Sequence, residues 1–374
     1  MPFRHLYVHV PFCARRCSYC DFSIAVRRAV PVAEYINALT KEIEVRQVGQ
    51  RCDALRSLYF GGGTPSRLGA DGVSALLHSI RQQVSLDVDA EVTLEANPED
   101  ITTDALRAWR IAGVNRLSIG VQSFDDDVLR WMHRAHNAQQ ARGALALARA
   151  QGFDAFSVDL IFGVPDALER DWERDINEVA SLHPPHVSLY GLTVETHTPL
   201  GHWRARGQAV ESPEERYEAE FLHAHHQLAH VGFEHYEVSN FALPGERARH
   251  NSAYWSDAPY LGVGPSAHGF DGTQRRWNES AYAAWLRRVT LGADPVHGCE
   301  TLTGENRTAE AVYLGLRTRD GLTLRPSEGS HVATWLAAGW VEWTTAARER
   351  IRCTATGWLR LDSLAADLTA FRSH

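Results

Sequence analysis

Lysine is almost absent from this chain of 374 residues. Lys41 is its only lysine, and arginine supplies the other positively charged side chains. It lies in "YINALTKEIEV", a predicted helix in which Lys41 is expected to face water. The side chains expected to face inward are Tyr35, Ile36, Leu39 and Ile43. Schiff-base catalysis needs a desolvated or electrostatically activated lysine amine, so the sequence argues against such chemistry and against pyridoxal phosphate.

The chain also lacks long apolar runs and an excess of positive charge. No segment approaches the roughly 18 apolar residues of a membrane-spanning helix. The start, "MPFRHLYVHVPFC", has a short strand where a secretory signal has a longer apolar region. The net charge of −8 argues against nucleic acid as a partner. We expect a cytoplasmic protein, whose clustered cysteines indicate metal or redox chemistry because that compartment is reducing.

Strand-like and helix-like segments alternate through the first half of the chain. Such alternation predicts an α/β fold with a parallel sheet, either a partial (β/α)6 barrel or an open doubly wound sheet. The predicted strands are 6–10, 57–61, 91–96, 116–121, 156–163 and 186–192. The predicted helices lie near 32–48, 70–84, 102–112, 137–151 and 170–182.

Polar residues follow or interrupt five successive predicted strands. They comprise the cysteine loop after the first strand, then Gly61–Thr64, Glu95 with Asn97, Gln122 with Ser123, and Asp159. Barrel enzymes collect their chemistry where the strands end, which favours a barrel. An open sheet also binds ligands at this edge, so the pattern by itself leaves both architectures open.

The pattern changes after about residue 196. A long helix is predicted over 212–231, followed by a loop rich in glycine, proline and aromatic residues over 236–270. Beyond residue 303, helices are predicted at 306–317 and 327–338, with a hairpin formed by 339–345 and 350–361. We therefore divide the chain into a core barrel (1–235), a connecting segment containing "HNSAYW" (236–300) and a small C-terminal α/β domain (301–374).

Three cysteines with the spacing C-x3-C-x2-C, namely Cys13, Cys17 and Cys20, follow the first predicted strand. A zinc site would need a fourth cysteine or histidine nearby, and His9 on the preceding strand is expected to point away. A [4Fe-4S] cluster fits better, because three thiolates hold three irons and leave the fourth open. The remaining cysteines are isolated and are expected to be small core residues: Cys52, Cys299 and Cys353.

The motifs "YVHVPFCARRCSYCDF", "GGGTPS", "GVNRLSIGVQSF", "DLIFGVP" and "HNSAYW" occur in this order. Together they resemble the oxygen-independent coproporphyrinogen III oxidase-like family of the radical S-adenosylmethionine (SAM) superfamily and, within it, the HemW-type heme chaperones. The resemblance extends from about residue 5 to the C-terminus. It implies a partial (β/α)6 TIM-like barrel with a smaller C-terminal domain, and it names the [4Fe-4S] cluster and SAM as cofactors.

The same resemblance implies that SAM chelates the open iron through its amino and carboxylate groups, and that one electron from the cluster cleaves its sulfonium carbon–sulfur bond. The residues that it assigns to SAM are Tyr7, Tyr19, Gly62, Gly63, Thr64, Glu95, Gln122, Arg134 and Asp159. Without the resemblance, the glycines could form a plain tight turn, the tyrosines could be core residues, and Asp159 could be a buried, paired carboxylate. Whether one or two SAM molecules bind stays open.

His250 of "HNSAYW" is the candidate heme ligand, because a neutral imidazole is a common axial ligand of heme iron. Tyr254 and Trp255 could pack against a porphyrin face. The alternative is a structural histidine, and the resemblance favours heme. His268 is expected to line the cavity of the cluster. The histidines of the long helix, which are His223, His225, His226 and His230, are expected on a solvated face.

The resemblance implies a heme chaperone that delivers heme to acceptor hemoproteins, including membrane-bound respiratory enzymes contacted peripherally. An electron donor is a further expected partner, and a homodimer stays open. The first alternative is a radical SAM enzyme acting on a porphyrin, either a coproporphyrinogen III oxidase or a methyltransferase-like or heme-opening relative. The second is a redox-sensing module. The oxidases have a longer arm before the cysteines and a further cysteine where this chain has Phe22, so we favour the chaperone over the enzyme.

Overall fold

The protein is described by a computed structural model that covers residues 2–344 and 346–373. Its centre is a nine-stranded sheet with the strand order β11-β1-β4-β5-β6-β7-β8-β10-β9. Seven of these strands run parallel, and the six that follow one another in the sheet are β1 (Phe3–Val10), β4 (Cys52–Gly62), β5 (Leu86–Ala96), β6 (Arg116–Gln122), β7 (Ala155–Phe162) and β8 (His186–Gly191). The six predicted strands match them, except that the predictions 156–163 and 186–192 each extend one residue too far. The parallel α/β class is confirmed.

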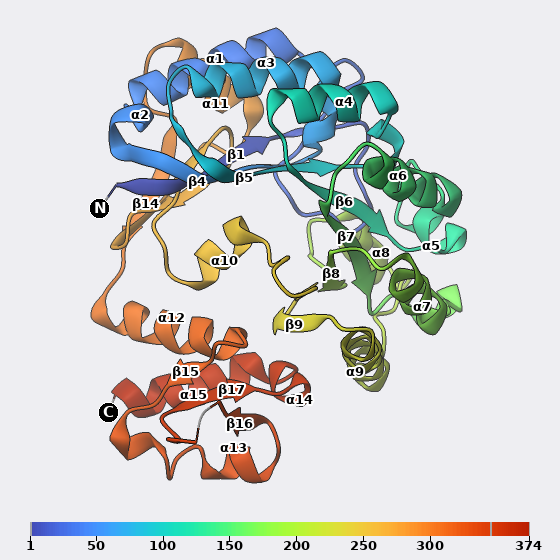
Figure 1. The fold of residues 1–374 in the computed structure, drawn as a ribbon, viewed down its shortest axis with the longest axis vertical. Coiled ribbons are helices and arrows are strands. Elements are labelled where there is room, and N and C mark those ends of the chain that lie inside the picture. The colour runs from blue at the N-terminus through green and yellow to red at the C-terminus, as the bar shows by residue number, and fades with distance from the viewer. Residues whose placement is uncertain (1, 345, 374) are drawn as a thin grey trace.

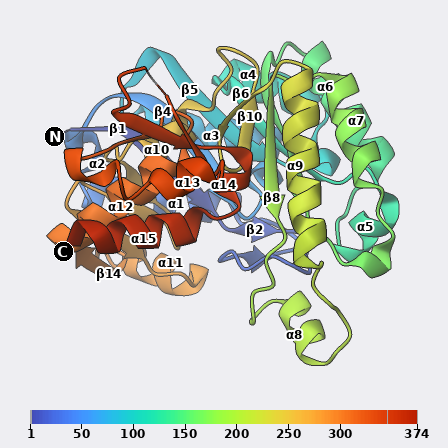
Figure 2. The ribbon, with the colours of Figure 1, turned by 90° about the horizontal axis from the view of Figure 1, so that it is seen from below.

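Helices follow the parallel strands and cover the outer side of the curved sheet (Figures 1 and 2). They are α1 (Val32–Val45), α3 (Gly69–Arg81), α4 (Thr103–Ala112), α6 (Ala138–Ala150), α7 (Trp172–Leu182) and α9 (Glu214–His230). Their ends carry expected signals: Asn137 and Gln140 form a capping box at α6, and Gly113 ends α4 with a φ of 108°. The shorter α2 (Val48–Arg51), α5 (Asp126–Trp131) and α8 (Pro199–Ala205) were not predicted as separate helices.

The sheet is an open arc, as the partial-barrel prediction requires. At one end, β11 (Leu261–Val263) pairs parallel with β1. At the other end, β10 (Asn240–Ala242) and β9 (Glu234–Glu237) pair antiparallel beyond β8. These end strands are not paired with each other in the described ranges. Segment 236–300 thus supplies β10 and β11 to the main sheet, while the predicted domain boundaries themselves stay a prediction.

The connecting segment 236–300 contains more regular structure than expected, because a long loop was predicted over its residues 236–270. It contains α10 (Arg249–Trp255), which lies on the inner side of the arc, between the sheet and the C-terminal region (Figure 1). A small antiparallel sheet follows, made of β12 (His268–Phe270), β13 (Gln274–Asn278) and β14 (Val296–Thr301), with α11 (Tyr282–Thr290) inserted before β14. The loop prediction was wrong here because α10 is stabilised by residues far away in the sequence.

A buried carboxylate joins α11 and β13 to the barrel. Glu42 on α1 is fully buried, and its oxygens accept hydrogen bonds from four donors. These are Arg46 Nη1 at 2.7 Å, Asn278 Nδ2 at 2.7 Å, Trp285 Nε1 at 2.7 Å and the Gly264 N–H at 2.8 Å. A buried charge with this many partners is compensated, and removing it would leave the donors unpaired.

The C-terminal region is a small α/β unit, as expected. Its three-stranded sheet has the order β15-β17-β16, and α12 (Gly304–Arg317) packs against α15 (Leu361–Ser373). The strands are β15 (Leu322–Thr323), β16 (Val341–Trp343) and β17 (Arg350–Cys353). The hairpin prediction is confirmed over β16 and β17, with Thr345 outside the described residues.

Two predictions in this unit were wrong in extent. The helix expected over 327–338 is a 3₁₀ turn at Pro326–Glu328 followed by the short α13 (Ala333–Ala337). The second hairpin strand ends at Cys353, where Thr354 caps α14 (Ala355–Trp358) by accepting a hydrogen bond from the Gly357 N–H. The helix α15, which follows, was not predicted.

The single lysine and the three isolated cysteines lie only partly where the sequence predicted them. Lys41 is exposed, and its Nζ donates to the Thr290 carbonyl at 2.7 Å. Cys353 is a buried core residue and Cys52 is half-buried, but Cys299 is exposed on β14, so the core prediction was wrong for Cys299. Across residues 2–344 and 346–373, no helix combines the length and apolar character needed to cross a membrane.

Candidate functional site

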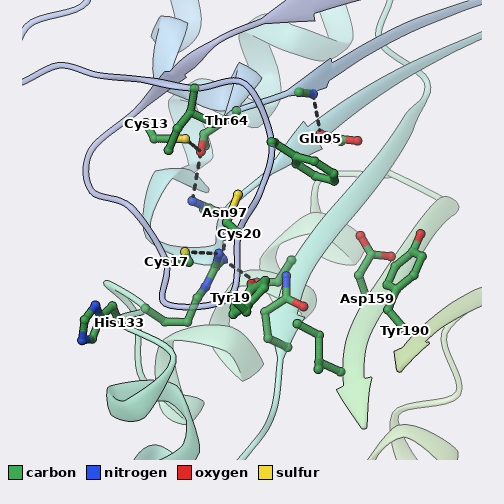
Figure 3. Close-up of a pocket in the computed structure, with 18 of the residues that line it drawn as sticks. Cys13, Cys17, Tyr19, Cys20, Thr64, Glu95, Asn97, His133, Asp159 and Tyr190 are labelled. Atoms are coloured by element: carbon green, nitrogen blue, oxygen red, sulfur yellow. Dashed lines mark hydrogen bonds between the residues drawn. The ribbon is translucent and has the colours of Figure 1, made fainter. Parts of the chain in front are cut away.

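A cavity of about 490 Å³ opens where the parallel strands end. Most residues predicted for the cluster and for SAM line it, although they come from six different strands and loops (Figure 3). They are Cys13, Cys17, Tyr19, Cys20, Gly62, Gly63, Thr64, Glu95, Gln122, Arg134 and Asp159. Tyr7 is not among the lining residues, but its ring stacks on that of Tyr59, which does line the cavity. The expectation that five successive strands deliver polar groups to one rim is confirmed, but it was wrong for Ser123, which is buried and donates to Asp175 instead.

The cysteine loop is fixed to its surroundings at several points. Two short strands, β2 (Phe12–Cys13) and β3 (Ala25–Val26), pair with each other at its base. In its middle, the buried Ser18 donates its N–H to the Met132 carbonyl at 3.2 Å, and its own carbonyl accepts from the Leu200 N–H on α8 at 2.8 Å. The backbone between Cys17 and Cys20 is thus held by contacts from α5 and α8.

The glycines after β4 allow the cysteine loop to approach closely. A Cβ on Gly63 would lie 2.6 Å from the Pro11 carbonyl and 3.1 Å from Cys13 Sγ. Gly62 has a φ of 114°, and a Cβ there would lie 2.6 Å from the His9 ring. Only glycine fits both positions without moving the loop, because any larger residue would displace backbone atoms or a buried ring. The "GGGTPS" motif therefore shapes the floor beside Cys13.

Glu95 is a carboxylate held on the cavity wall. Tyr59 O–H donates to its Oε1 at 2.8 Å, and the Gly62 N–H donates to its Oε2 at 3.1 Å. Burial raises the pKa of Glu95 from 4.5 to about 7, although these two hydrogen bonds act in the opposite direction. The cavity therefore holds a carboxyl group that titrates near neutral pH and would favour a cationic ligand.

Asp159 is a second buried carboxyl group, tied into a chain of hydroxyls. Its Oδ2 accepts from Ser118 Oγ at 2.6 Å and its Oδ1 from Ser157 Oγ at 2.7 Å. Burial raises its pKa, and the serine hydrogen bonds lower it in part. Beyond Ser157, the ring of His186 lies 2.8 Å from Ser157 Oγ. The network fixes one orientation of Asp159 on the wall.

Gln122 and Arg134 both have side-chain atoms near Gly120 of β6, and Arg134 also reaches the second cysteine, Cys17. Gln122 ends β6 with a φ of 66°, which is uncommon for a residue with a side chain. Arg134 Nη2 donates to Asn97 Oδ1 at 2.7 Å and to the Gly120 carbonyl at 2.8 Å, and its Nη1 lies 3.6 Å from Cys17 Sγ. Its buried Nε has no hydrogen-bond partner among the described residues. The guanidinium is thus fixed next to the Cys17 thiol and keeps one N–H donor for a ligand.

The three thiols fit a three-cysteine cluster. Burial raises the pKa of Cys13 and raises that of Cys20 to about 11, so these side chains would be neutral thiols without a cation to bind. In the part of the chain that the structure describes, no three His, Cys, Asp or Glu side chains converge on one metal ion. A [4Fe-4S] cluster does not require such convergence, because each cysteine holds a different iron.

Sequence reasoning missed several lining residues. These are Ser118, Tyr190 and Tyr59, the last of which positions Glu95, whereas Asn97 was expected beside Glu95 and does line the cavity. Side chains along a strand alternate between the two faces of the sheet. The two-residue period that places Glu95 and Asp159 on the cavity side could therefore also have identified the missed residues. The expectation that His9 points away was wrong: its Nε2 lies 2.9 Å from the Ser23 carbonyl, in the loop after the cysteines.

His250 lies outside the cavity lining, at the N-terminal end of α10. Its ring is 1% exposed and stacks on Tyr59 at a centroid distance of 5.0 Å. Its Nδ1 lies 2.6 Å from Ser57 Oγ, and its Nε2 lies 2.8 Å from the Tyr254 hydroxyl. Burial lowers the pKa of His250 to about 3, so the ring is neutral. Both nitrogens are engaged, and iron could bind only after one of these contacts is released.

The first turn of α10 is held by a carboxylate from β5. Glu91 accepts hydrogen bonds from the Arg249 N–H at 2.9 Å and from the His250 N–H at 2.8 Å. These are N–H groups that a helix start otherwise leaves unpaired. In this arrangement "HNSAYW" fastens α10 to the inner face of the sheet.

The other histidines are distributed differently from the expectation. His268 is exposed on β12 and stacks on Trp277, so the expectation that it lines the cavity was wrong. On α9, His226 and His230 are exposed as expected. His225 is half-buried instead, with its Nδ1 2.9 Å from Nδ1 of the buried His235.

Comparison with known proteins identifies relatives over most of the chain. The sequence pattern of the radical SAM superfamily matches residues 7–179. Heme chaperone HemW of Bacillus subtilis is 34% identical over 320 residues, covering 85% of this chain and 84% of that protein. Heme chaperone HemW of Mycobacterium tuberculosis is 37% identical over 325 residues, covering 85% and 83%.

Among solved structures, coproporphyrinogen III oxidase (HemN) from Escherichia coli, described as a radical SAM enzyme, superimposes with a TM-score of 0.82. The match covers 99% of this chain and 90% of that chain, with 23% sequence identity. At this level of identity the likeness concerns the fold, and it confirms the predicted radical SAM architecture including the C-terminal region.

Proposed function

Because the chain belongs to the HemW family of the radical SAM superfamily, we propose that it is a heme chaperone that carries a [4Fe-4S] cluster and SAM. One observation carries the cofactor part of the proposal. Three thiols spaced C-x3-C-x2-C line the same cavity as the glycine loop, two carboxyl groups and a buried guanidinium. Few ligands other than an iron–sulfur cluster with SAM would need thiols, a backbone that a ligand can approach closely, and both acidic and basic side chains in one cavity.

In this proposal, Cys13, Cys17 and Cys20 hold three irons of the cluster. The cluster, when bound, supplies one electron to SAM. The chain's own groups would orient SAM: the Gly62–Thr64 backbone allows close approach, and Glu95 and Asp159 favour its positively charged groups. Arg134 Nε, which has no partner in the part of the chain that the structure describes, supports an anionic ligand such as the SAM carboxylate.

The heme part of the proposal is supported by the family. The relatives are named heme chaperones, and we propose that this chain likewise passes heme to acceptor hemoproteins, membrane-bound respiratory enzymes among them. His250 was the expected ligand, and for that role its ring would have to leave the contacts to Ser57 and Tyr254.

Cofactor reconstitution followed by transfer tests the proposal. The anaerobically reconstituted protein should contain iron and sulfide, bind SAM, bind one ferric heme per chain, and pass it to heme-free myoglobin as a probe acceptor. The same preparation should leave coproporphyrinogen III unchanged in the presence of SAM and a reductant. Formation of protoporphyrinogen would replace the chaperone by the oxidase, and a protein that binds no heme would contradict the proposal directly.

A further inference from the structure

A second histidine is placed better than His250 to meet heme. His133 follows α5 and is the one histidine that lines the cavity in the described part of the chain. Its side chain is exposed, and no hydrogen bond to its ring is found among the described residues. An imidazole nitrogen must be accessible and unprotonated to bind iron, and His133 meets the first condition where the buried His250 does not.

The backbone and a tryptophan hold His133 in place. Its φ is 59°, in the left-handed region, within a turn closed by its own N–H to Arg130 O at 3.0 Å. The next N–H, of Arg134, bonds to Leu129 O at 2.9 Å and so directs that arginine into the cavity. The edge of the His133 ring packs on Trp203 of α8 at a centroid distance of 5.3 Å. A residue with a side chain in this conformation is uncommon and marks a constrained position.

The surrounding rim suits a flat apolar molecule with acidic groups. Phe22 is 61% exposed and Tyr190 is 44% exposed, and both line the cavity, which offers two accessible aromatic side chains to a ligand. Figure 3 shows His133 and Tyr190 on opposite sides of the cavity. The exposed Arg15 on the cysteine loop adds a guanidinium. Heme has an apolar macrocycle, an iron that takes imidazole and two propionates, and each has a matching group here.

We propose that heme binds at the mouth of this cavity with His133 as an axial ligand of its iron and with Phe22 and Tyr190 against the macrocycle. The inference rests on the proposed function, because heme as the ligand comes from the family. It differs from the expectation for His250, whose contacts to Ser57, Tyr254 and Glu91 fasten α10 instead.

Replacement of His133 by glycine tests the assignment with little risk to folding. Glycine accepts a positive φ more readily than histidine does, so His133→Gly removes the imidazole and keeps the turn. The probes are ferric heme and metal-free protoporphyrin IX, titrated against the full chain by absorbance. The matched control is His226→Ala, which removes an exposed histidine of α9 outside the cavity lining.

His133→Gly should weaken ferric heme binding on the order of tenfold or more and abolish the imidazole-ligated spectrum, and free imidazole should restore that spectrum. Protoporphyrin IX should bind both proteins equally, because it has no iron, and Phe22→Ser should weaken both probes. A His133→Gly protein with wild-type heme affinity and spectrum would overturn the assignment while leaving the chaperone proposal intact. A wild-type protein that binds neither probe would contradict the chaperone proposal itself.

Discussion

Replacement of Glu95 by glutamine should change how the stability of the protein depends on pH. Burial raises the pKa of Glu95 from 4.5 to about 7 in the folded protein. Between these two values the folded state keeps the proton that the unfolded state has released. The free energy of unfolding therefore falls as pH rises through this window, and it becomes constant above about pH 7.

The size of the effect follows from that pKa difference. A rise from 4.5 to about 7, at about 1.4 kcal/mol per pKa unit, corresponds to about 3 kcal/mol of lost stability at alkaline pH. Glutamine carries no charge at any pH. Its single oxygen can accept from the Gly62 N–H, and its amide N–H can donate to the Tyr59 hydroxyl oxygen, which accepts as well as donates. Glu95→Gln should therefore match the wild type near pH 4.5 and be more stable by about 3 kcal/mol above pH 7.

Urea denaturation of the wild type and of Glu95→Gln at several pH values measures the difference between their free energies of unfolding. The titration of all other groups cancels in this difference, because the two proteins share those groups. Glu44→Gln, at an exposed position of α1, is the matched control and should show no such slope. SAM provides a second readout, because a cation favours ionised Glu95: its affinity should rise between pH 6 and 8, roughly, in the wild type only. A Glu95→Gln difference that is flat from about pH 5 to 8 would refute the assigned titration.

Three further changes test the cluster loop and the buried network. Cys17→Ser should prevent full cluster loading, and an unchanged iron content per chain would remove Cys17 from the ligand set. Gly63→Ala should lower cluster content because its Cβ would meet backbone at 2.6 Å, whereas Gly143→Ala, with no atom within 4 Å, should load normally. Glu42→Gln should cost about 3 kcal/mol in urea denaturation since it leaves a buried arginine uncompensated, while a cost near that of Glu44→Gln would show that the network adds little.

Local signals in the sequence were sufficient for the strands, the outer helices and the cysteine loop. Apolar runs bounded by glycine and proline predicted the six parallel strands, and the Asn137–Gln140 capping box is itself a local pattern. The polar residues at the strand ends could be grouped in advance, because parallel strands bring their C-terminal ends to one edge. Thus Glu95 and Asp159 were predicted for one cavity although 64 positions separate their residue numbers.

The surroundings of the histidines could not be predicted in the same way. The motif "HNSAYW" indicated a ligand, yet Glu91 and Ser57, which contact His250, come from strands more than 150 positions earlier. No sequence motif pointed to His133 as a ligand. The exposure of its side chain depends on how the turn after α5 packs against α8. Burial and hydrogen-bond partners of a single side chain depend on such long-range contacts.

The sequence by itself determined the parallel α/β class and the set of three thiols, because the alternation of strand and helix segments and the spacing of the cysteines are local features of the chain. Its ordered motifs carried the resemblance to the radical SAM family. Only the tertiary structure decided which of those side chains face the cavity. It placed Glu95 and Arg134 in the cavity wall and left His133 accessible at the cavity mouth. It buried the ring of His250 between α10 and the sheet. The physical reason is that the accessibility, the pKa and the hydrogen-bond partners of a side chain are set by neighbours from distant segments, which meet only when the chain folds.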